Sequence, residues 1–179
     1  AVLLTGRARQ RLLGDAAAAR LEKHADVVWA QGDPDGWDLD ALLDGADAAL
    51  TGWWTPALSE PLIDAHPRLG FIGHTAGPVR GLIPLELIGH RIRVSQATEF
   101  FAPSVSEFTL LHILSSLRHL PALDRELKSG ATFEDFEDRL APGLLRGRTV
   151  GVVGASRSGR AVVRLLLAFG AHVLVVDPT

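Results

Sequence analysis

Two glycines frame a short stretch between an apolar run and a helical pattern near the end of the chain. Gly154 directly follows the apolar run Val150–Val153, and Gly159 lies where a helical pattern reaching Phe169 begins. A glycine at the first position allows a tight turn, and a glycine at the second allows the helix to pack closely on the strand. The helix N-terminus then presents unbonded amides to a pyrophosphate. The spacing is typical of a dinucleotide-binding fingerprint.

Two further residues bear on this fingerprint. Asp177 ends the next apolar run, where a carboxylate can accept hydrogen bonds from the adenine ribose hydroxyls and disfavours a 2′-phosphate. This favours NAD as the cofactor. Ser156 stands where the fingerprint has its second glycine, and its hydroxyl can donate to a phosphate instead. The alternative is a βαβ turn that binds nothing, in which Gly154 and Gly159 serve the backbone geometry alone.

Three more candidates lie in loops that follow predicted strands. His74 comes after the apolar run Leu69–Ile72, and Trp53 and Trp54 come after Ala48–Leu50. Open α/β sheets bind their ligands at the carboxyl ends of the strands, and an aromatic ring there can form a wall of the pocket. We therefore expect His74 and Trp54 at the substrate site. The alternatives are a loop histidine with local hydrogen bonds, and one tryptophan that packs in the core beside another that is partly exposed.

Composition excludes several classes of protein. The chain has no cysteine, so it forms no disulfide, no Cys-ligated zinc site and no thiol nucleophile. Its formal net charge is −3 without a basic cluster, which argues against nucleic acid as a partner. His112 and His119 share one predicted helix face, but no carboxylate joins them at ligand spacing, so no metal site is predicted. We find no membrane-length apolar run and expect a cytoplasmic protein without a membrane partner.

The elements that must position these residues alternate between short apolar runs and stretches of helical period. Such alternation is typical of a parallel sheet covered by helices. The predicted strands are residues 2–4, 27–29, 48–50, 69–72 and 92–94. Helical patterns follow them at residues 9–24, 39–43, 60–65 and 85–89. These elements predict an open α/β sheet, and we favour the flavodoxin-like strand order.

A long helical pattern over residues 104–128 separates this sheet from the fingerprint. Pro103, Ser104 and Glu107 form a capping-box signature for its start, and Pro121 is expected to kink it. Residues 130–147 have mixed charge and few apolar side chains, as in a linker. We therefore predict one domain over residues 1–102 and a second over residues 103–179, with the connecting helix, the linker and the first βαβ unit of a dinucleotide-binding fold.

These parts in this order resemble the D-isomer-specific 2-hydroxyacid dehydrogenases. The stretches that carry the resemblance are residues 67–72 with 75–77, residues 105–107, and residues 145–154 through Asp177. The resemblance implies a flavodoxin-like substrate domain followed by a Rossmann NAD-binding domain. It also implies that the backbone amides of Ala76 and Gly77 bind the substrate carboxylate, and that Arg157 and Ser158 contact the pyrophosphate.

The resemblance also has departures and an expected continuation. Phe101 stands where the family commonly has an asparagine, and Val79 where it usually has an aspartate. The family's catalytic arginine, glutamate and histidine lie after the second Rossmann strand, so we expect them beyond Thr179 and none of them in this chain. We expect the native polypeptide to continue past Thr179 for ~130 to 150 residues, which would complete a truncated Rossmann domain of ordinary size. The 179 residues alone should then be inactive.

The resemblance implies an NAD-dependent oxidoreductase that passes hydride between the nicotinamide and C2 of a small D-2-hydroxy or 2-keto acid. By the same resemblance, residues 104–128 and the following linker would form a homodimer interface. One alternative is a non-catalytic NAD(H)-binding regulatory or corepressor-like member of the family. Another is a different two-domain NAD enzyme, such as a formate or amino-acid dehydrogenase.

Overall fold

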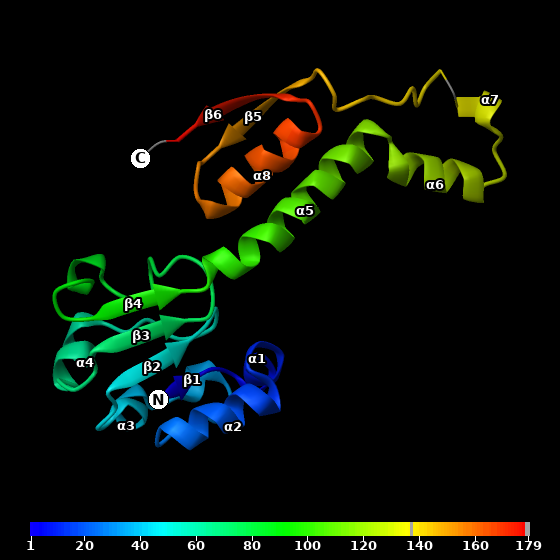
Figure 1. Ribbon diagram of the computed structural model, residues 1–179. Coiled ribbons are helices and arrows are strands. Elements are labelled where there is room, and N and C mark those ends of the chain that lie inside the picture. Colours follow the sequence, from blue (N-terminus) through cyan, green and yellow to red (C-terminus); the bar gives the residue numbers. More distant parts are fainter. Residues whose placement is uncertain (137, 178–179) are drawn as a thin grey trace. The chain divides into compact units, whose positions relative to one another are not determined.

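The computed structural model describes residues 1–136 and 138–177, and it divides into two compact units (Figure 1). The first unit is Ala1–Ala97, and the second begins at Thr98. This division lies before the predicted boundary between residues 102 and 103, because Thr98 already belongs to the long helix.

The first unit is built on a parallel sheet of four strands. These are β1 (Val2–Leu3), β2 (Ala48–Thr51), β3 (Phe71–His74) and β4 (Arg93–Gln96), in the order β1-β2-β3-β4. The predicted strand at residues 27–29 is reduced to one parallel bridge, from Trp29 to Val2, on the free side of β1. The Val2 amide donates to the Val28 carbonyl at 2.8 Å. The second segment thus flanks the first, which confirms the flavodoxin-like order.

Helices cover both faces of this sheet, as a parallel sheet requires. Val2 and Leu4 are buried with Ala8 on one face, against the side of helices α1 (Gly6–Leu12) and α2 (Gly14–His24). The intervening Leu3 is buried on the other face with residues of α3 (Leu39–Leu43) and α4 (Glu60–Ala65). The side chains of a strand alternate between faces, so two residues of β1 anchor two separate clusters.

Two helical predictions in this unit are wrong in detail. The single helix expected over residues 9–24 is two helices, because the chain breaks at Leu13 and Gly14, and Gly14 adopts a φ of +64°. The pattern at residues 85–89 forms only a short 3₁₀ helix, η2 (Leu85–Leu87); a second one, η1, spans Pro34–Gly36. By contrast, α3 and α4 have the predicted bounds, with Asp38 and Ser59 as their N-caps.

The second unit combines helices with a two-stranded parallel sheet (Figure 1). Its elements are α5 (Thr98–Leu117), α6 (Leu120–Lys128), α7 (Phe133–Phe136), β5 (Thr149–Val153), α8 (Arg157–Ala168) and β6 (His172–Val176). Val150 pairs with Val173 in the β5–β6 register. Buried Leu145 and Leu166 pack with these strands and with one side of α5. The strand, helix and strand form a βαβ unit, as the fingerprint predicts.

The long helix differs from its prediction at both ends. It begins at Thr98, so Ser104 is not its N-cap and Pro103 lies inside it. The nearby hydroxyl of Ser106 donates to the Pro103 carbonyl at 2.7 Å. The break comes at His119, which has a left-handed φ of 52° and caps α6, whereas Pro121 lies in the first helical turn. A proline is tolerated there because it lacks only an amide that has no helical partner.

Helix α5 also corrects the expectation about apolar length. By length and composition alone it could cross a membrane, with a mean hydropathy of 1.2 over an 18-residue window. Helices of soluble proteins can meet the same two criteria. Here one side of α5, with Leu110, Ile113 and Leu117, packs in the core of the second unit. Phe108 and Leu111 are exposed.

Candidate cofactor site and substrate-side loops

The fingerprint turn leaves β5 through Gly154. This residue has a φ of +95°, a conformation that side chains rarely adopt. Its amide donates to the carbonyl of Val176 at 2.7 Å, so the turn starts where the pairing with β6 ends. The predicted role of Gly154 in a tight turn agrees with this geometry.

Gly159 lies against the start of the same turn. A Cβ at this position would overlap the Gly154 carbonyl, which is backbone and has little freedom to move. Glycine is therefore required for α8 to approach β5 this closely.

Ser156 closes the turn as the N-cap of α8. Its Oγ accepts a hydrogen bond from the amide of Gly159 at 3.4 Å. The departure from the glycine pattern thus has a local reason, because serine is among the preferred N-cap residues. Within residues 1–136 and 138–177, we find no hydrogen bond from the amides of Arg157 and Ser158. These amides belong to the positive first turn of a 12-residue helix, where an anion is favoured.

Asp177 contacts the turn directly from the end of β6. Its Oδ2 accepts a hydrogen bond from the Ala155 amide at 2.8 Å. On the other side of the same residue, Arg160 Nη1 donates to the Ala155 carbonyl at 2.6 Å. Ala155 is thus held by one acidic and one basic side chain. Arg160 was not predicted, because an arginine in the first turns of an exposed helix face carries no distinctive signal.

The loop after β3 offers two backbone donors. Ala76 is fully buried, and its carbonyl accepts from the amide of Ala97 at 3.2 Å. Among the residues that the structure describes, no hydrogen bond is found from the amides of Ala76 and Gly77. Such amides can bind a carboxylate, which is the role the resemblance assigns to them.

His74 is not a loop residue, which corrects the prediction. It is the last residue of β3, is only 6% exposed, and pairs in register with Thr51 of β2. Its Nδ1 is hydrogen-bonded to Thr51 Oγ1 at 2.9 Å. Burial lowers the pKa of His74. The ring therefore joins the ends of two strands, and its contact with substrate stays a prediction.

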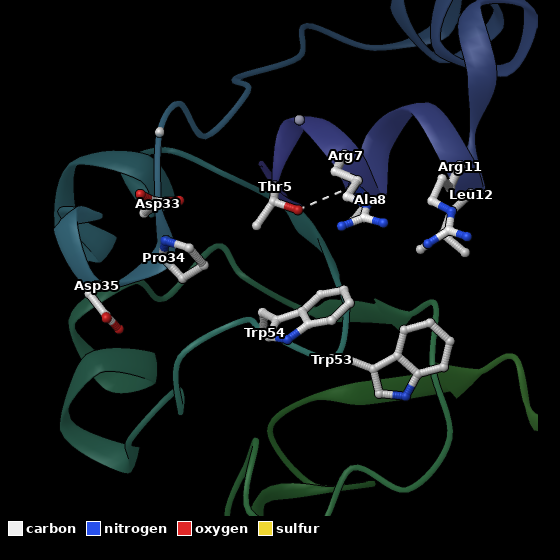
Figure 2. Close-up of a pocket in the computed structure, with 12 residues that line it drawn as sticks. Thr5, Arg7, Ala8, Arg11, Leu12, Asp33, Pro34, Asp35, Trp53 and Trp54 are labelled. Atoms are coloured by element: carbon white, nitrogen blue, oxygen red, sulfur yellow. Dashed lines mark hydrogen bonds between the residues drawn. The ribbon is translucent and has the colours of Figure 1, made fainter.

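Trp53 and Trp54 lie in the loop after β2 and are 56% and 62% exposed. Thr55 holds this loop, because its hydroxyl donates to the Leu3 carbonyl at 2.7 Å and accepts from the Gly52 amide at 2.8 Å. Both tryptophans line a pocket of about 1310 Å³ within the first unit. Figure 2 shows them facing Arg7 and Arg11, which the sequence analysis did not identify. Trp54 therefore lines a pocket, as predicted, whereas its contact with substrate stays a prediction.

The structure does not test the prediction about the catalytic side chains. The arginine, glutamate and histidine of the resemblance were expected beyond Thr179, and Thr179 itself lies outside the described residues, which end at Asp177. Their position therefore stays a prediction.

Comparisons with known proteins agree with this architecture. Residues 110–179 match the NAD binding domain of D-isomer specific 2-hydroxyacid dehydrogenases. A D-3-phosphoglycerate dehydrogenase from Mycobacterium bovis is 29% identical over 170 residues, which are 93% of this chain and 30% of that protein. The chain thus spans less than a third of that relative.

Two solved structures show the same fold. A protein from Pyrococcus horikoshii superposes with a TM-score of 0.79 at 23% identity, over 99% of this chain and 52% of that one. The D-lactate dehydrogenase of Aquifex aeolicus, in complex with NAD and lactic acid, superposes with a TM-score of 0.69 at 24% identity. The match covers 100% of this chain and 52% of that one.

The fold and the fingerprint turn define an NAD-binding α/β protein with parallel sheets, which confirms the predicted fold class and cofactor. More narrowly, residues 110–179 match the NAD binding domain of the D-isomer-specific 2-hydroxyacid dehydrogenases, and a relative over 93% of the chain is a dehydrogenase, which supports the predicted family. The residues predicted to contact the cofactor and the substrate stay predictions.

Proposed function

We propose that the native protein is an NAD-dependent dehydrogenase that interconverts a small D-2-hydroxy acid and its 2-keto acid. The observation that carries this proposal is the turn from Gly154 to Gly159, with the Asp177 carboxylate bonded to it. The relatives are dehydrogenases, which supports the enzyme over the regulatory alternative.

The cofactor side of the site follows from the geometry of the turn. The amides of Arg157 and Ser158, at the positive end of α8, bind the pyrophosphate. The shape of the turn brings the backbone next to the pyrophosphate. This shape depends on Gly154, Ser156 and Gly159. Asp177 accepts from the adenine ribose hydroxyls, with its carboxylate oriented by the Ala155 amide. When bound, NAD supplies the hydride chemistry.

The substrate side follows from the loops at the carboxyl ends of β2 and β3. The amides of Ala76 and Gly77 bind the substrate carboxylate and so fix the position of its C2. Trp54 forms a wall of the pocket beside these loops. His74 supports this edge of the sheet through Thr51.

We also propose that the native protein is a homodimer through α5 and the segment that follows it. One side of α5 packs in its own unit, whereas Val105, Phe108 and Leu111 on the helix are exposed large hydrophobic residues. A second copy would bury them in a two-fold interface.

The test uses the polypeptide as its gene encodes it. Its intact mass is measured first and compared with 19.2 kDa, the mass of the sequence analysed. NADH oxidation is then followed with pyruvate, phenylpyruvate and hydroxypyruvate. We expect turnover with at least one of these acids and production of the D-isomer. NADH binding without turnover of any 2-keto acid would contradict the enzyme and favour the regulatory alternative.

A further inference from the structure

A pocket in the first unit has a polarised lining that the proposed reaction does not explain. It lies between one side of α1, the segment 32–35 and the loop with Trp53 and Trp54 (Figure 2). All three segments follow strands or the bridge at Trp29, so they lie at the ligand-binding edge of the sheet. We call it the Arg–Trp pocket.

One wall of the Arg–Trp pocket is cationic. Arg7 and Arg11 are four positions apart on α1, which places them on the same side of the helix, and both extend toward the tryptophans (Figure 2). Within the described ranges, neither guanidinium makes an ion pair or a hydrogen bond. Arg9 differs, since it lies 4.0 Å from Glu22 and stacks 3.6 Å over the Trp29 ring. Arg9 therefore pairs its charge within the fold, whereas in the part of the chain that the structure describes the guanidinium groups of Arg7 and Arg11 are left to bind a ligand.

The facing wall is aromatic and is held in place. The rings of Trp53 and Trp54 meet edge to face with centroids 6.1 Å apart, and both are exposed. The two hydrogen bonds of Thr55 tie their loop to β1 and to Gly52. Because both rings are more than half exposed and their loop is held in place, their open faces offer a preformed surface to an aromatic or other planar group.

The third wall is acidic. Asp33 and Asp35 flank Pro34 on the side of the pocket away from Arg11 (Figure 2). Two carboxylates balance two guanidinium groups, so the pocket attracts no anion by net charge. The pocket instead orients a ligand, because an anionic group is favoured beside α1 and disfavoured beside segment 32–35.

The Arg–Trp pocket also adjoins the proposed carboxylate-binding turn. The amide and the hydroxyl of Thr75 both donate to the Thr51 carbonyl at 2.8 Å, so the start of the loop that carries Ala76 and Gly77 is bonded to the residue before the loop that carries the tryptophans. Both loops belong to the first unit and follow strands that pair in register at Thr51 and His74.

We propose that Arg7 and Arg11 bind an oxyanion carried by an aromatic or other planar apolar group that packs on Trp53 and Trp54. This group is the distal part of the substrate, so the substrate class is a 2-hydroxy acid with a second, distant anionic group. Only this last identification rests on the proposed function. Guanidinium groups suit a carboxylate or a phosphate, because both accept paired hydrogen bonds.

The first experiment measures binding to the native polypeptide by calorimetry and by tryptophan fluorescence. The probes are benzoate and phenyl phosphate, with benzamide as the uncharged analogue of benzoate and inorganic phosphate as the anion without a ring. We expect the two aromatic anions to bind about tenfold more tightly than benzamide or inorganic phosphate. The aromatic anion that binds more tightly shows whether a carboxylate or a phosphate is the preferred group.

Variants assign the binding to the pocket. The double variant Arg7→Gln/Arg11→Gln should bind benzoate and phenyl phosphate about tenfold more weakly. Arg20→Gln, which removes an exposed arginine of α2 outside the pocket, should bind them like the unaltered chain. Circular dichroism confirms that each variant is folded. Equal binding of benzoate and benzamide, or equal losses in the Arg20 variant and the double variant, would overturn the proposal.

A second experiment separates this inference from the proposed function. In the native polypeptide, the KM for 4-carboxyphenylpyruvate should be below that for phenylpyruvate, and the double variant should remove the difference while leaving the KM for pyruvate unchanged. Turnover of pyruvate without that difference would refute the inference alone. Binding of the aromatic anions without turnover of any keto acid would refute the proposed function alone.

Discussion

The carboxylate of Asp177 is hydrogen-bonded to the backbone amide of Ala155, 2.8 Å away, so the end of β6 is tied to the turn that follows β5. A residue selected for its expected contact with a ribose thus also holds the phosphate-binding turn. The two roles are compatible because a carboxylate has two oxygens and several acceptor directions. In the proposed site, cofactor choice and turn geometry are therefore coupled through Asp177.

Replacement of Asp177 tests this coupling. In the native polypeptide, Asp177→Asn should raise the Kd for NADH and reduce the discrimination against NADPH by about tenfold or more, because a neutral amide no longer repels a 2′-phosphate. Titrations with both cofactors measure this. Asp26→Asn, at an exposed position of the first unit, is the control and should bind both like the unaltered protein. Unchanged discrimination in the Asp177 variant would count against the ribose role.

The contact between Gly159 and Gly154 makes a second prediction. Gly159→Ala should lower the free energy of unfolding by about 1–3 kcal/mol, because the added methyl overlaps a backbone carbonyl and forces α8 away from β5. The matched control is Gly151→Ala in β5, where an added Cβ meets nothing within 4 Å. Chemical denaturation compares the two. Equal stability of the two variants would show that the close approach is not required.

The buried ring of His74 predicts a dependence of stability on pH. Burial lowers the pKa of His74 in the folded state below 6.5, whereas in the unfolded chain the ring titrates near its ordinary value. The unfolded state therefore binds a proton first as the pH falls. The stabilisation is fully present above about pH 6.5 and is lost as the pH falls from there through the lowered pKa of the folded state.

The measurement is the free energy of unfolding at about pH 7.5 and about pH 5.5. His74→Asn should reduce the difference between the two values, and it should also be less stable at the higher pH because the bond to Thr51 is lost. His24→Asn, at an exposed position on α2, should retain the difference. An unchanged difference in the His74 variant would show that the pH dependence of stability comes from other groups.

The exposed side of α5 predicts the oligomeric state. Phe108 is 61% exposed, and its ring contacts that of His112 with centroids 4.3 Å apart. If α5 forms the dimer interface, Phe108→Glu should convert the native protein to a monomer, because a carboxylate would be buried without a partner. Sedimentation velocity measures this. Leu85→Glu, at an exposed apolar position of the first unit, should leave the dimer intact. A dimer that persists in the Phe108 variant would place the interface elsewhere.

Several features could be predicted because they depend on neighbouring residues alone. Helices α3 and α4 have the expected bounds since each begins with a side chain that caps its own first turn, Asp38 and Ser59. Gly154 adopts the positive φ that the fingerprint requires. The strand order also followed from the sequence, because right-handed crossovers allow few arrangements of alternating strands and helices.

Other features depended on contacts between distant residues. Pro103 and Ser104 carry a local start signal, but the helix begins earlier, at Thr98. His74 was expected in a loop, yet pairing with Thr51, 23 positions earlier, extends β3 to include it. Strand ends are fixed by such pairing, which no local pattern reveals.

The sequence alone indicated the α/β class and the cofactor, because these follow from the order of elements and from glycine and carboxylate spacing in one βαβ unit, and the family came from the resemblance. Only the tertiary structure brought Arg7 and Arg11 of α1 to face Trp53 and Trp54 (Figure 2). These pairs are far apart in the chain and become neighbours because β1 and β2 lie side by side in the sheet. The meeting of these side chains therefore arises from strand pairing, which the linear pattern of residues does not contain.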